Sequence, residues 1–180
     1  MGHSRAYPVF RSDDADAAYA RAQALCRGLE FVEDERWVEA LVGDAERVRA
    51  VAGVVPGALF EGADKEAYDP WGDRRAACFP VWVFEEHASA DVELPFLRAV
   101  GEDPAMIGWR GRWPGAHGRD QYDGVQVSFH SDDVELDPDS GPVGTHTVFL
   151  HVDKGCPSER VRELAARAGS ELLGAARIGW

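Results

Sequence analysis

Two residue types are nearly missing from this chain of 180 residues, and cysteine is scarce. The chain contains no asparagine, and only two of its 19 basic side chains are lysines, Lys65 and Lys154. Avoidance of residues with AT-rich codons indicates a GC-rich genome, and hence a bacterial protein. The three cysteines, Cys26, Cys78 and Cys156, are odd in number and far apart, which is a poor disulfide framework. We therefore expect free thiols and a reducing compartment.

Long apolar segments are also lacking. The most hydrophobic stretch, residues 76–84, is interrupted by Pro80 and is far shorter than the roughly 20 apolar residues that cross a bilayer. The N-terminal residues do not contain the basic region and apolar core of a secretory signal. These absences predict a cytoplasmic protein that does not associate with membranes.

Basic charge is in deficit, because 32 acidic side chains face 19 basic ones, a formal net charge of −13. The acids concentrate in residues 61–103 and 128–153, whereas residues 108–119 hold three arginines and no acid. An acidic surface repels polyanions, so the composition disfavours nucleic acid and anionic membranes as partners. In most proteins such acidity serves solubility alone. The sharper hypothesis is attraction to a basic protein partner.

Several segments have the apolar spacing of helices. The clearest are residues 15–29 and 158–172. Asp44 is a suitable N-cap for a third helix, and residues 94–100 predict a short fourth. The third helix and the one over 158–172 share the sequence Glu-Arg-Val-Arg, and each lies between two expected strands. This order predicts two β-α-β units, although similar helix composition explains the shared sequence more simply than internal duplication.

Apolar and β-branched runs predict the strands. They are residues 7–11, 29–32, 37–42, 56–61, 76–86, 125–129, 147–152 and 173–180. Residues 108–124 hold five glycines and show little periodicity, which predicts a long loop. The pattern as a whole predicts an α+β fold with a mixed or antiparallel sheet and two to three helices packed on one face, in a single compact domain of residues 1–180. Two ferredoxin-like halves, residues 1–90 and 91–180, are the alternative arrangement.

The expected long loop contains the one locally basic stretch and several aromatic residues. Arginine binds carboxylate or phosphate through two parallel hydrogen bonds, and tryptophan stacks on planar ligands or on arginine. One hypothesis is a small-molecule enzyme or ligand-binding domain with a site for a small anionic ligand, formed by Trp109, Arg110, Arg112, Trp113, His117, Arg119 and Tyr122. The alternative is that the tryptophans pack at the edge of the core while the arginines pair with nearby carboxylates.

Histidines and carboxylates cluster in residues 130–153, and such side chains suit divalent metals. Their spacing argues against a single site, because His146 and His151 are an odd number of positions apart and would face opposite sides of a strand. The sequence also lacks the common nucleotide-binding, zinc-binding, calcium-binding and hydrolase motifs. We therefore predict no metal ion and no cofactor.

Cys156 precedes an expected helix, whose N-terminus could stabilise a thiolate. Cys156 and Arg162 have the Cys-x5-Arg spacing of cysteine phosphatases, and they are the one catalytic candidate in the sequence. Pro157 removes a backbone donor from such an anion site, and Glu159 adds a repelling charge. A half-buried or helix-capping cysteine is the commoner role of such a residue.

The sequence thus favours a binding protein over an enzyme. The leading hypothesis is a small acidic inhibitor or immunity-type protein that neutralises a basic protein partner, because opposite charge speeds association. The expected contacts are carboxylates and one aromatic anchor, namely Asp64, Asp69, Trp71, Asp73, Asp132, Asp133, Glu135 and Asp137.

Overall fold

The computed structural model describes residues 4–72, 75, 78–115 and 122–180. Its strands are β1 (Ser4–Ser12), β2 (Glu30–Val42), β3 (Leu59–Glu61), β4 (Val81–Glu85), β5 (Ala105–Arg112), β6 (Asp123–Phe129), β7 (His146–Asp153) and β8 (Arg177–Ile178). Its helices are α1 (Ala15–Cys26), α2 (Ala45–Val54), α3 (Glu93–Val100) and α4 (Ser158–Arg167), and a 3-10 turn, Ala90–Val92, precedes α3.

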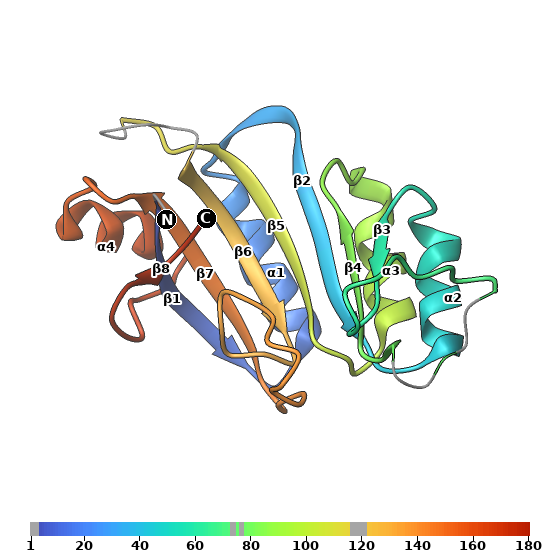
Figure 1. Cartoon of the computed structure of the whole chain (residues 1–180). Coiled ribbons are helices and arrows are strands. Elements are labelled where there is room, and N and C mark those ends of the chain that lie inside the picture. The colour runs from blue at the N-terminus through green and yellow to red at the C-terminus, as the bar shows by residue number, and fades with distance from the viewer. Residues whose placement is uncertain (1–3, 73–74, 76–77, 116–121) are drawn as a thin grey trace.

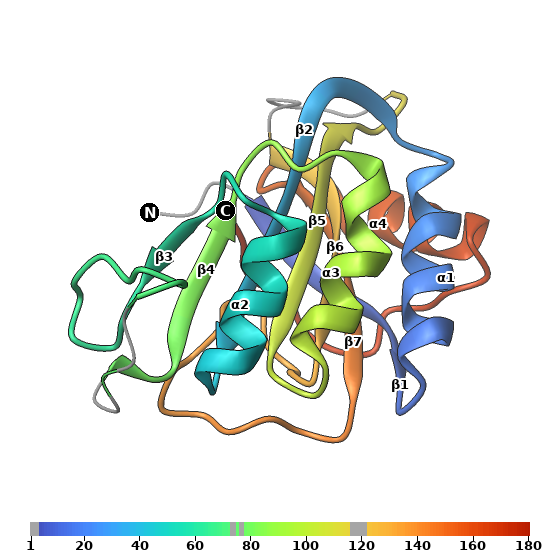
Figure 2. The ribbon, with the colours of Figure 1, turned by 90° about the vertical axis from the view of Figure 1, so that its right-hand side faces the viewer.

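The strands form one sheet in the order β3-β4-β2-β5-β6-β7-β1-β8, and every neighbouring pair is antiparallel (Figure 1). Helices α1, α2 and α3 cover one face of this sheet (Figure 2), and α4 packs on the same side beside α1. The prediction of an α+β fold with an antiparallel sheet is therefore confirmed. The described residues contain four helices, more than the two to three predicted.

Each helix connects two strands that run in the same direction, because the strands that it joins lie an even number of positions apart in an antiparallel sheet. Helix α2 crosses β4, α3 crosses β2 and α4 crosses β1, whereas α1 crosses the three strands β7, β6 and β5. The predicted order of strand, helix and strand around α2 and α4 is present. In each unit, however, another strand lies between the two strands that the helix joins: β4 between β2 and β3, and β1 between β7 and β8.

The two ends of the sheet have matching arrangements. Reading inward from one edge, β3 and β2 are the first and third strands and are joined by α2. Reading inward from the other edge, β8 and β7 are the first and third strands and are joined by α4. Strand β1 belongs to the second group although it comes from the start of the chain, so a division between residues 1–90 and 91–180 does not separate the sheet into two contiguous parts.

The prediction of a long loop over residues 108–124 is wrong, because most of β5 and the start of β6 occupy this range. Because this range contains several glycines, the alternation of its side chains between the two faces of a strand was not recognised. A Cβ atom at Gly108 would lie 1.9 Å from the Trp37 ring, and one at Gly111 would lie 2.7 Å from the carbonyl oxygen of Glu30. Glycine is therefore required at both positions by the close approach of β2, within a continuous strand.

Other boundaries also differ from the prediction. The expected strands 29–32 and 37–42 are one strand, β2, and the expected strand 173–180 contains only Arg177 and Ile178 in β8. Helix α4 ends at Arg167, and Gly169 follows with a φ of 67°, a conformation that favours glycine and stops the helix.

The main core lies between the sheet and the helices, and the alternation of each strand fills it. In β5, Ile107 and Trp109 point into this core and are almost fully buried, whereas Arg110 faces the opposite side. In β2, Val38 and Ala40 point inward in the same way. The face of the sheet opposite the helices thus receives the even-numbered side chains of β5.

Local capping defines the start of two helices. The side chain of Asp14 accepts hydrogen bonds from the first backbone N–H groups of α1, and Asp44 does the same for α2. Both residues are N-caps of the kind that the sequence predicted for Asp44.

Within the described residues, the structure contains no helix of the length and hydrophobicity needed to span a membrane.

Candidate functional site

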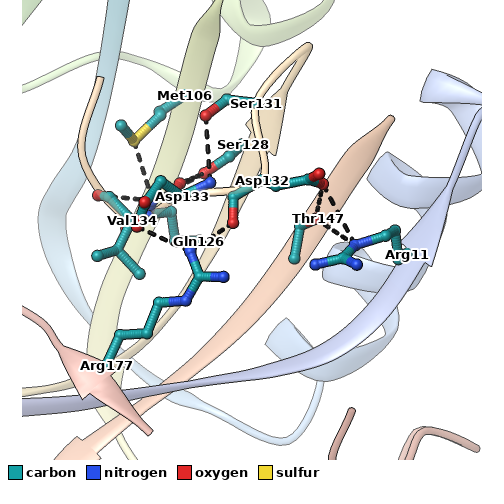
Figure 3. A network of polar contacts seen from close by, with 10 residues as sticks. All are labelled: Arg11, Met106, Gln126, Ser128, Ser131, Asp132, Asp133, Val134, Thr147 and Arg177. Atoms are coloured by element: carbon teal, nitrogen blue, oxygen red, sulfur yellow. Dashed lines mark hydrogen bonds and ion pairs between the residues drawn. The ribbon is translucent and has the colours of Figure 1, made fainter. Parts of the chain in front are cut away.

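The face of the sheet opposite the helices carries polar and aromatic side chains, and we call it the open face. Residues 130–145 cross part of it (Figure 1). Two hydrogen bonds from β6 hold this segment down (Figure 3): Gln126 donates to the carbonyl of Val134 at 3.1 Å, and Ser128 donates to the carbonyl of Asp133 at 2.7 Å. The segment is therefore anchored to the sheet and forms one wall of the cavities beside it.

Two adjoining cavities open on this face. The smaller has a volume of about 210 Å³, and its walls include Trp37, Glu39, Phe84, Arg110, His151 and Trp180. The larger has a volume of about 660 Å³, and its walls include Leu41, Glu61, Phe79, Trp82, Leu136 and Asp139. They adjoin because Trp82, in the larger cavity, donates a hydrogen bond of 2.7 Å to Glu39 in the smaller one.

One end of the smaller cavity is aromatic. The rings of Trp37 and Trp180 meet edge to face, with their centroids 4.7 Å apart. The guanidinium carbon of Arg110 lies 5.3 Å from the Trp37 ring and 5.7 Å from the Trp180 ring, which are distances of cation–π contacts. Arg110 also lies 3.9 Å from the carboxylate of Glu35. The arginine is thus held by two rings and one distant acid.

A fully buried histidine lies beneath this aromatic end. His151 stacks on Trp180 with ring centroids 3.4 Å apart, and its Nε2 lies 3.1 Å from the side-chain oxygen of Gln126. Because that oxygen only accepts, Nε2 carries the proton, and Nδ1 accepts from the hydroxyl of Ser4 at 3.3 Å. Burial, and then the charge of Arg110, holds the pKa of His151 well below its usual value. His151 is therefore a neutral structural group.

The other end of the smaller cavity is acidic. Glu39 accepts the hydrogen bond from Trp82, and Phe84 lies opposite Glu39 on the neighbouring strand. Burial raises the pKa of Glu39, and the negative charge of Glu135 raises it further, although the hydrogen bond from Trp82 acts in the opposite direction. Glu135 makes no hydrogen bond or ion pair with any residue that the structure describes. This end thus holds two carboxylates, and none of the described residues places a cation between them.

The structure separates the residues predicted to bind an anion. Trp109 and Trp113 are buried on the helix side of the sheet, whereas Arg110 lines the open face and Arg112 follows two positions later on the same strand. Tyr122 is half-buried and directly precedes β6. His117 and Arg119 lie outside the described residues. The proposed loop therefore does not form one site from the residues described, and its tryptophans have the packing role considered as the alternative.

Three of the carboxylates predicted to contact a partner bind within the chain. Asp132 accepts hydrogen bonds from Thr145 and Thr147 and pairs with Arg11 at 3.2 Å (Figure 3). Partial burial alone would raise the pKa of Asp132, but these hydrogen bonds and charges together lower it.

Arg177 extends this internal pairing. It donates to the carboxylate of Asp133 at 2.8 Å (Figure 3). Asp137 accepts from the backbone N–H of Asp139 and the hydroxyl of Ser140, which lowers its pKa and stabilises a turn. These carboxylates shape the segment 130–145 and are not free acceptors.

The remaining predicted partner residues lie on other parts of the surface. Asp64 pairs with Arg75 at 3.4 Å, and Asp69 accepts from the backbone N–H of Trp71. The side chain of Trp71 is 65% exposed, as expected for an anchor, and Asp73 lies outside the described residues. Of this predicted set, Glu135 is the carboxylate whose surroundings favour a ligand most directly.

Cys156 lies in a setting that opposes a catalytic thiolate. It is only 6% exposed, and burial together with the charge of Asp123 raises the pKa of its thiol. Arg162 is an exposed residue of α4. Burial therefore opposes the thiolate that the helix N-terminus could stabilise, and the surroundings of Cys156 fit the structural role considered the commoner one.

A buried polar cluster on the helix side was missed by sequence reasoning. Glu93, 2% exposed, accepts hydrogen bonds from Tyr19 at 2.5 Å and from the Trp109 indole at 2.9 Å, and it pairs with Arg36 at 2.7 Å. Burial and the contact with Glu93 raise the pKa of Tyr19. The cluster joins α1, α3, β2 and β5, so its role is structural.

The open face was also missed, although its signal was in the alternation of the strands. In residues 37–42, every second side chain, Trp37, Glu39 and Leu41, belongs to the open face.

The described residues contain no group of three or more histidine, cysteine, aspartate or glutamate side chains placed to hold a metal ion. The chain matches no protein-family model, and neither a curated protein nor a solved structure is significantly similar to it.

Proposed function

We propose that this protein binds a basic protein partner through its open face, as an inhibitor or immunity-type neutraliser would. The observation that carries the proposal is the larger cavity, whose walls come from two acidic segments far apart in sequence, residues 61–65 and 136–139. Each of these segments belongs to one of the two acid-rich stretches of the chain. A partner that reaches this cavity would therefore meet both.

The composition of this cavity is that of a protein interface. Leu41, Trp82 and Leu136 provide apolar surface, and Glu61 and Asp139 provide negative charge. Lys65 also lines the cavity and lies 3.9 Å from Glu61, but it is 80% exposed, so this pair is weak. Interfaces combine an apolar centre, rich in aromatic residues, with a charged rim. The net charge of −13 would accelerate the approach of a basic partner and fix its orientation. We also propose that the protein acts in the cytoplasm.

A fluorescence-anisotropy titration with a labelled nona-arginine peptide tests the proposal. Binding is expected to weaken steeply between about 50 mM and about 300 mM NaCl, because the contacts are largely electrostatic. The double variant Glu61→Gln, Asp139→Asn should lose about fivefold in affinity, as expected for two rim charges.

The matched control has the same change in net charge at a distance. Glu102→Gln, Glu171→Gln removes two exposed carboxylates that do not line either cavity. Equal losses in both double variants would mean that only total charge matters, and they would contradict the proposed site. Absent or salt-insensitive binding would contradict the proposed function.

A small anionic ligand is the second candidate, and a different groove supports it. Between α1 and α4 lies a groove of about 330 Å³ with Leu25, Leu164 and Trp113 in its walls and with Arg27 and Arg167 beside them. Neither arginine pairs with a carboxylate among the described residues. This combination suits a carboxylate with an apolar tail.

Thermal unfolding with and without octanoate tests this second candidate. A stabilising shift is expected in the native chain, because a ligand that binds only the folded state raises the unfolding temperature. The shift should disappear in Arg27→Gln, Arg167→Gln and persist in Arg5→Gln, Arg98→Gln. The absence of a shift in the native chain, or its persistence in the first variant, would rule out this groove.

We also infer that the sheet joins two ferredoxin-like units through β5 and β6. The support is that β2-α2-β3-β4-α3-β5 pairs in the order β3-β4-β2-β5, and that β6, β7, β1 and β8 repeat this order from the other edge. Native-state hydrogen exchange should then separate the amides into two cooperative groups along this division. Exchange of the whole sheet as one unit would contradict it.

A further inference from the structure

We infer that the acidic end of the smaller cavity receives the guanidinium group of an arginine side chain from the basic partner; this inference rests on the proposed function. The cavity end in question is formed by Glu39, Phe84, Met106 and Glu135, and we call it the acidic pocket. Its neighbour is the larger cavity, so an arginine of a bound partner can enter the acidic pocket while the rest of the partner covers the larger cavity.

The charges of the acidic pocket call for a cation. Glu39 is half-buried and has one hydrogen-bond donor, the Trp82 indole, for its two carboxylate oxygens. A half-buried carboxylate with so few partners is less stable than one paired with a cation. Glu135 faces the same cavity from the segment 130–145 and has no basic partner among the described residues. A cation between the two would relieve their mutual repulsion.

The walls of the acidic pocket favour a planar cation over a compact one. Phe84 lies directly across from Glu39 and stacks on Trp82, with ring centroids 5.5 Å apart and planes within 8°. Arginine stacks on aromatic faces and donates to carboxylates in fixed, paired directions, whereas lysine is a strongly hydrated point charge. A guanidinium placed on Phe84 would direct its N–H groups toward Glu39 and Glu135.

The chain's own arginine does not fill this role. Strand pairing places Glu39 beside Met106 and Trp37 beside Gly108, so Arg110 lies four positions further along β5 than the neighbour of Glu39. Four residues of a strand span about 13 Å. The Trp37 ring, which covers Gly108, lies between the two charged groups. Arg110 therefore belongs to the aromatic end, with Glu35 as its acid.

The titratable and charged groups around the cavity are few. Glu39, Arg110 and His151 come from the sheet, and Glu135 comes from the segment above it. His151 is neutral, so two carboxylates outnumber one arginine in the cavity as a whole. The site thus favours a cation even before the net charge of the protein is considered.

An NMR titration with Nα-acetyl-L-arginine amide tests the inference. The probe is added to the ¹⁵N-labelled full chain, and the indole N–H signal of Trp82 is followed because that group donates to Glu39. A saturable shift of this signal is expected with the arginine probe. Nα-acetyl-citrulline amide, which has the same shape without the charge, should cause no such shift, and the lysine analogue should bind more weakly.

Two variants locate the site independently. Glu39→Gln and the exposed Glu135→Gln should each weaken the arginine probe about fivefold or more, the scale expected for removing one charged contact. Glu135 makes no internal contact among the described residues, so its replacement does not threaten folding. Glu102→Gln is the control and should bind the probe with native affinity.

Several outcomes would overturn the inference. They are the absence of a shift, an equal shift with citrulline, equal or tighter binding of lysine, or native affinity in both Glu39→Gln and Glu135→Gln. If nona-arginine still binds with salt-dependent affinity while the arginine probe leaves Trp82 unchanged, the proposed function stands and only the pocket assignment fails. If nona-arginine does not bind, the proposed function fails whatever the small probe does.

Discussion

At the scale of single residues, the buried and half-buried acids on the two faces of the sheet differ in how many polar partners they have. On the helix side, Glu93 is buried with a full set of partners, Tyr19, Trp109 and Arg36. On the open face, Glu39 is half-buried with one partner. Buried polar groups are normally satisfied, and a group that lacks partners calls for an explanation. The acid with several partners is structural, and the half-buried acid with a single hydrogen-bond donor marks the proposed site.

Replacing Glu93 should destabilise the fold. Glu93→Gln removes the charge that pairs with Arg36 and leaves that partly exposed guanidinium without its acid, at an expected cost of about 2 kcal/mol. Tyr19→Phe removes one hydrogen bond and should cost about 1 kcal/mol. Urea unfolding measures both. A stability of Glu93→Gln equal to that of the native chain would show that the cluster contributes nothing.

The buried His151 should make the protein less stable in mild acid. In the unfolded chain a histidine takes up a proton near pH 6.5, whereas burial lowers the pKa in the folded chain well below that value. The unfolded state then binds more protons as the pH falls, so stability decreases below about pH 6.5. At pH 5.5 this one residue accounts for up to about 1.4 kcal/mol.

The control for this prediction is an exposed histidine. Urea unfolding at about pH 7.5 and about pH 5.5 should show a smaller loss of stability in His151→Gln than in the native chain. His87→Gln, at an exposed position, should keep the native loss. An unchanged pH dependence in His151→Gln would mean that folding does not lower the pKa of His151, and it would contradict the prediction.

The close approach of Trp37 to β5 predicts a strong effect at Gly108. In Gly108→Ala the new methyl group would overlap the Trp37 ring, so the ring or the strand must move, at a cost of about 1–3 kcal/mol. Gly144→Ala is the matched control, because a Cβ there meets nothing within 4 Å. Thermal unfolding compares the two variants. Equal stability of both would contradict the packing of Trp37 over β5.

At the scale of elements, amphipathic helices could be predicted and one central strand, β5, could not. Helices α1, α2, α3 and α4 lie where apolar spacing and caps such as Asp44 placed them. Strand β5 was missed because its glycines suggested a loop, whereas most of β6 was predicted as residues 125–129. The alternation in β5 was present, with Ile107 and Trp109 on one face and Arg110 on the other, but only the neighbouring strand explains why glycine is needed at residue 108.

Helix α2 provides a paired test of these local rules. Asp44→Ala removes the side chain that accepts from two N–H groups of the first turn, and it should cost about 1 kcal/mol. Gly53→Ala, near the end of the same helix, meets nothing within 4 Å and should stabilise the chain by about 0.5 kcal/mol. The midpoint of urea unfolding should therefore fall in Asp44→Ala and rise in Gly53→Ala. A stabilising Asp44→Ala would refute the capping assignment.

At the scale of the whole molecule, the sheet order decides which residues meet. The open-face cavities combine β2, β4, β5, β6 and β7 with the segments 61–65 and 134–139. No local pattern places these next to one another, because the contacts depend on strand pairing over long sequence distances. The acidic character of the proposed partner site follows from composition, whereas its position on the open face could not be predicted from the sequence. Glu135 was predicted, but its neighbour Glu39 was not.

The central claim is that a basic partner docks on the open face. Amide hydrogen exchange of the full chain, measured with and without saturating nona-arginine, tests it most directly. The account predicts slower exchange in residues 61–65 and 134–139, which line the cavities, and unchanged exchange in α1, α2 and α4 on the opposite side. Protection of those helices instead, or no protection anywhere at saturation, would contradict the account.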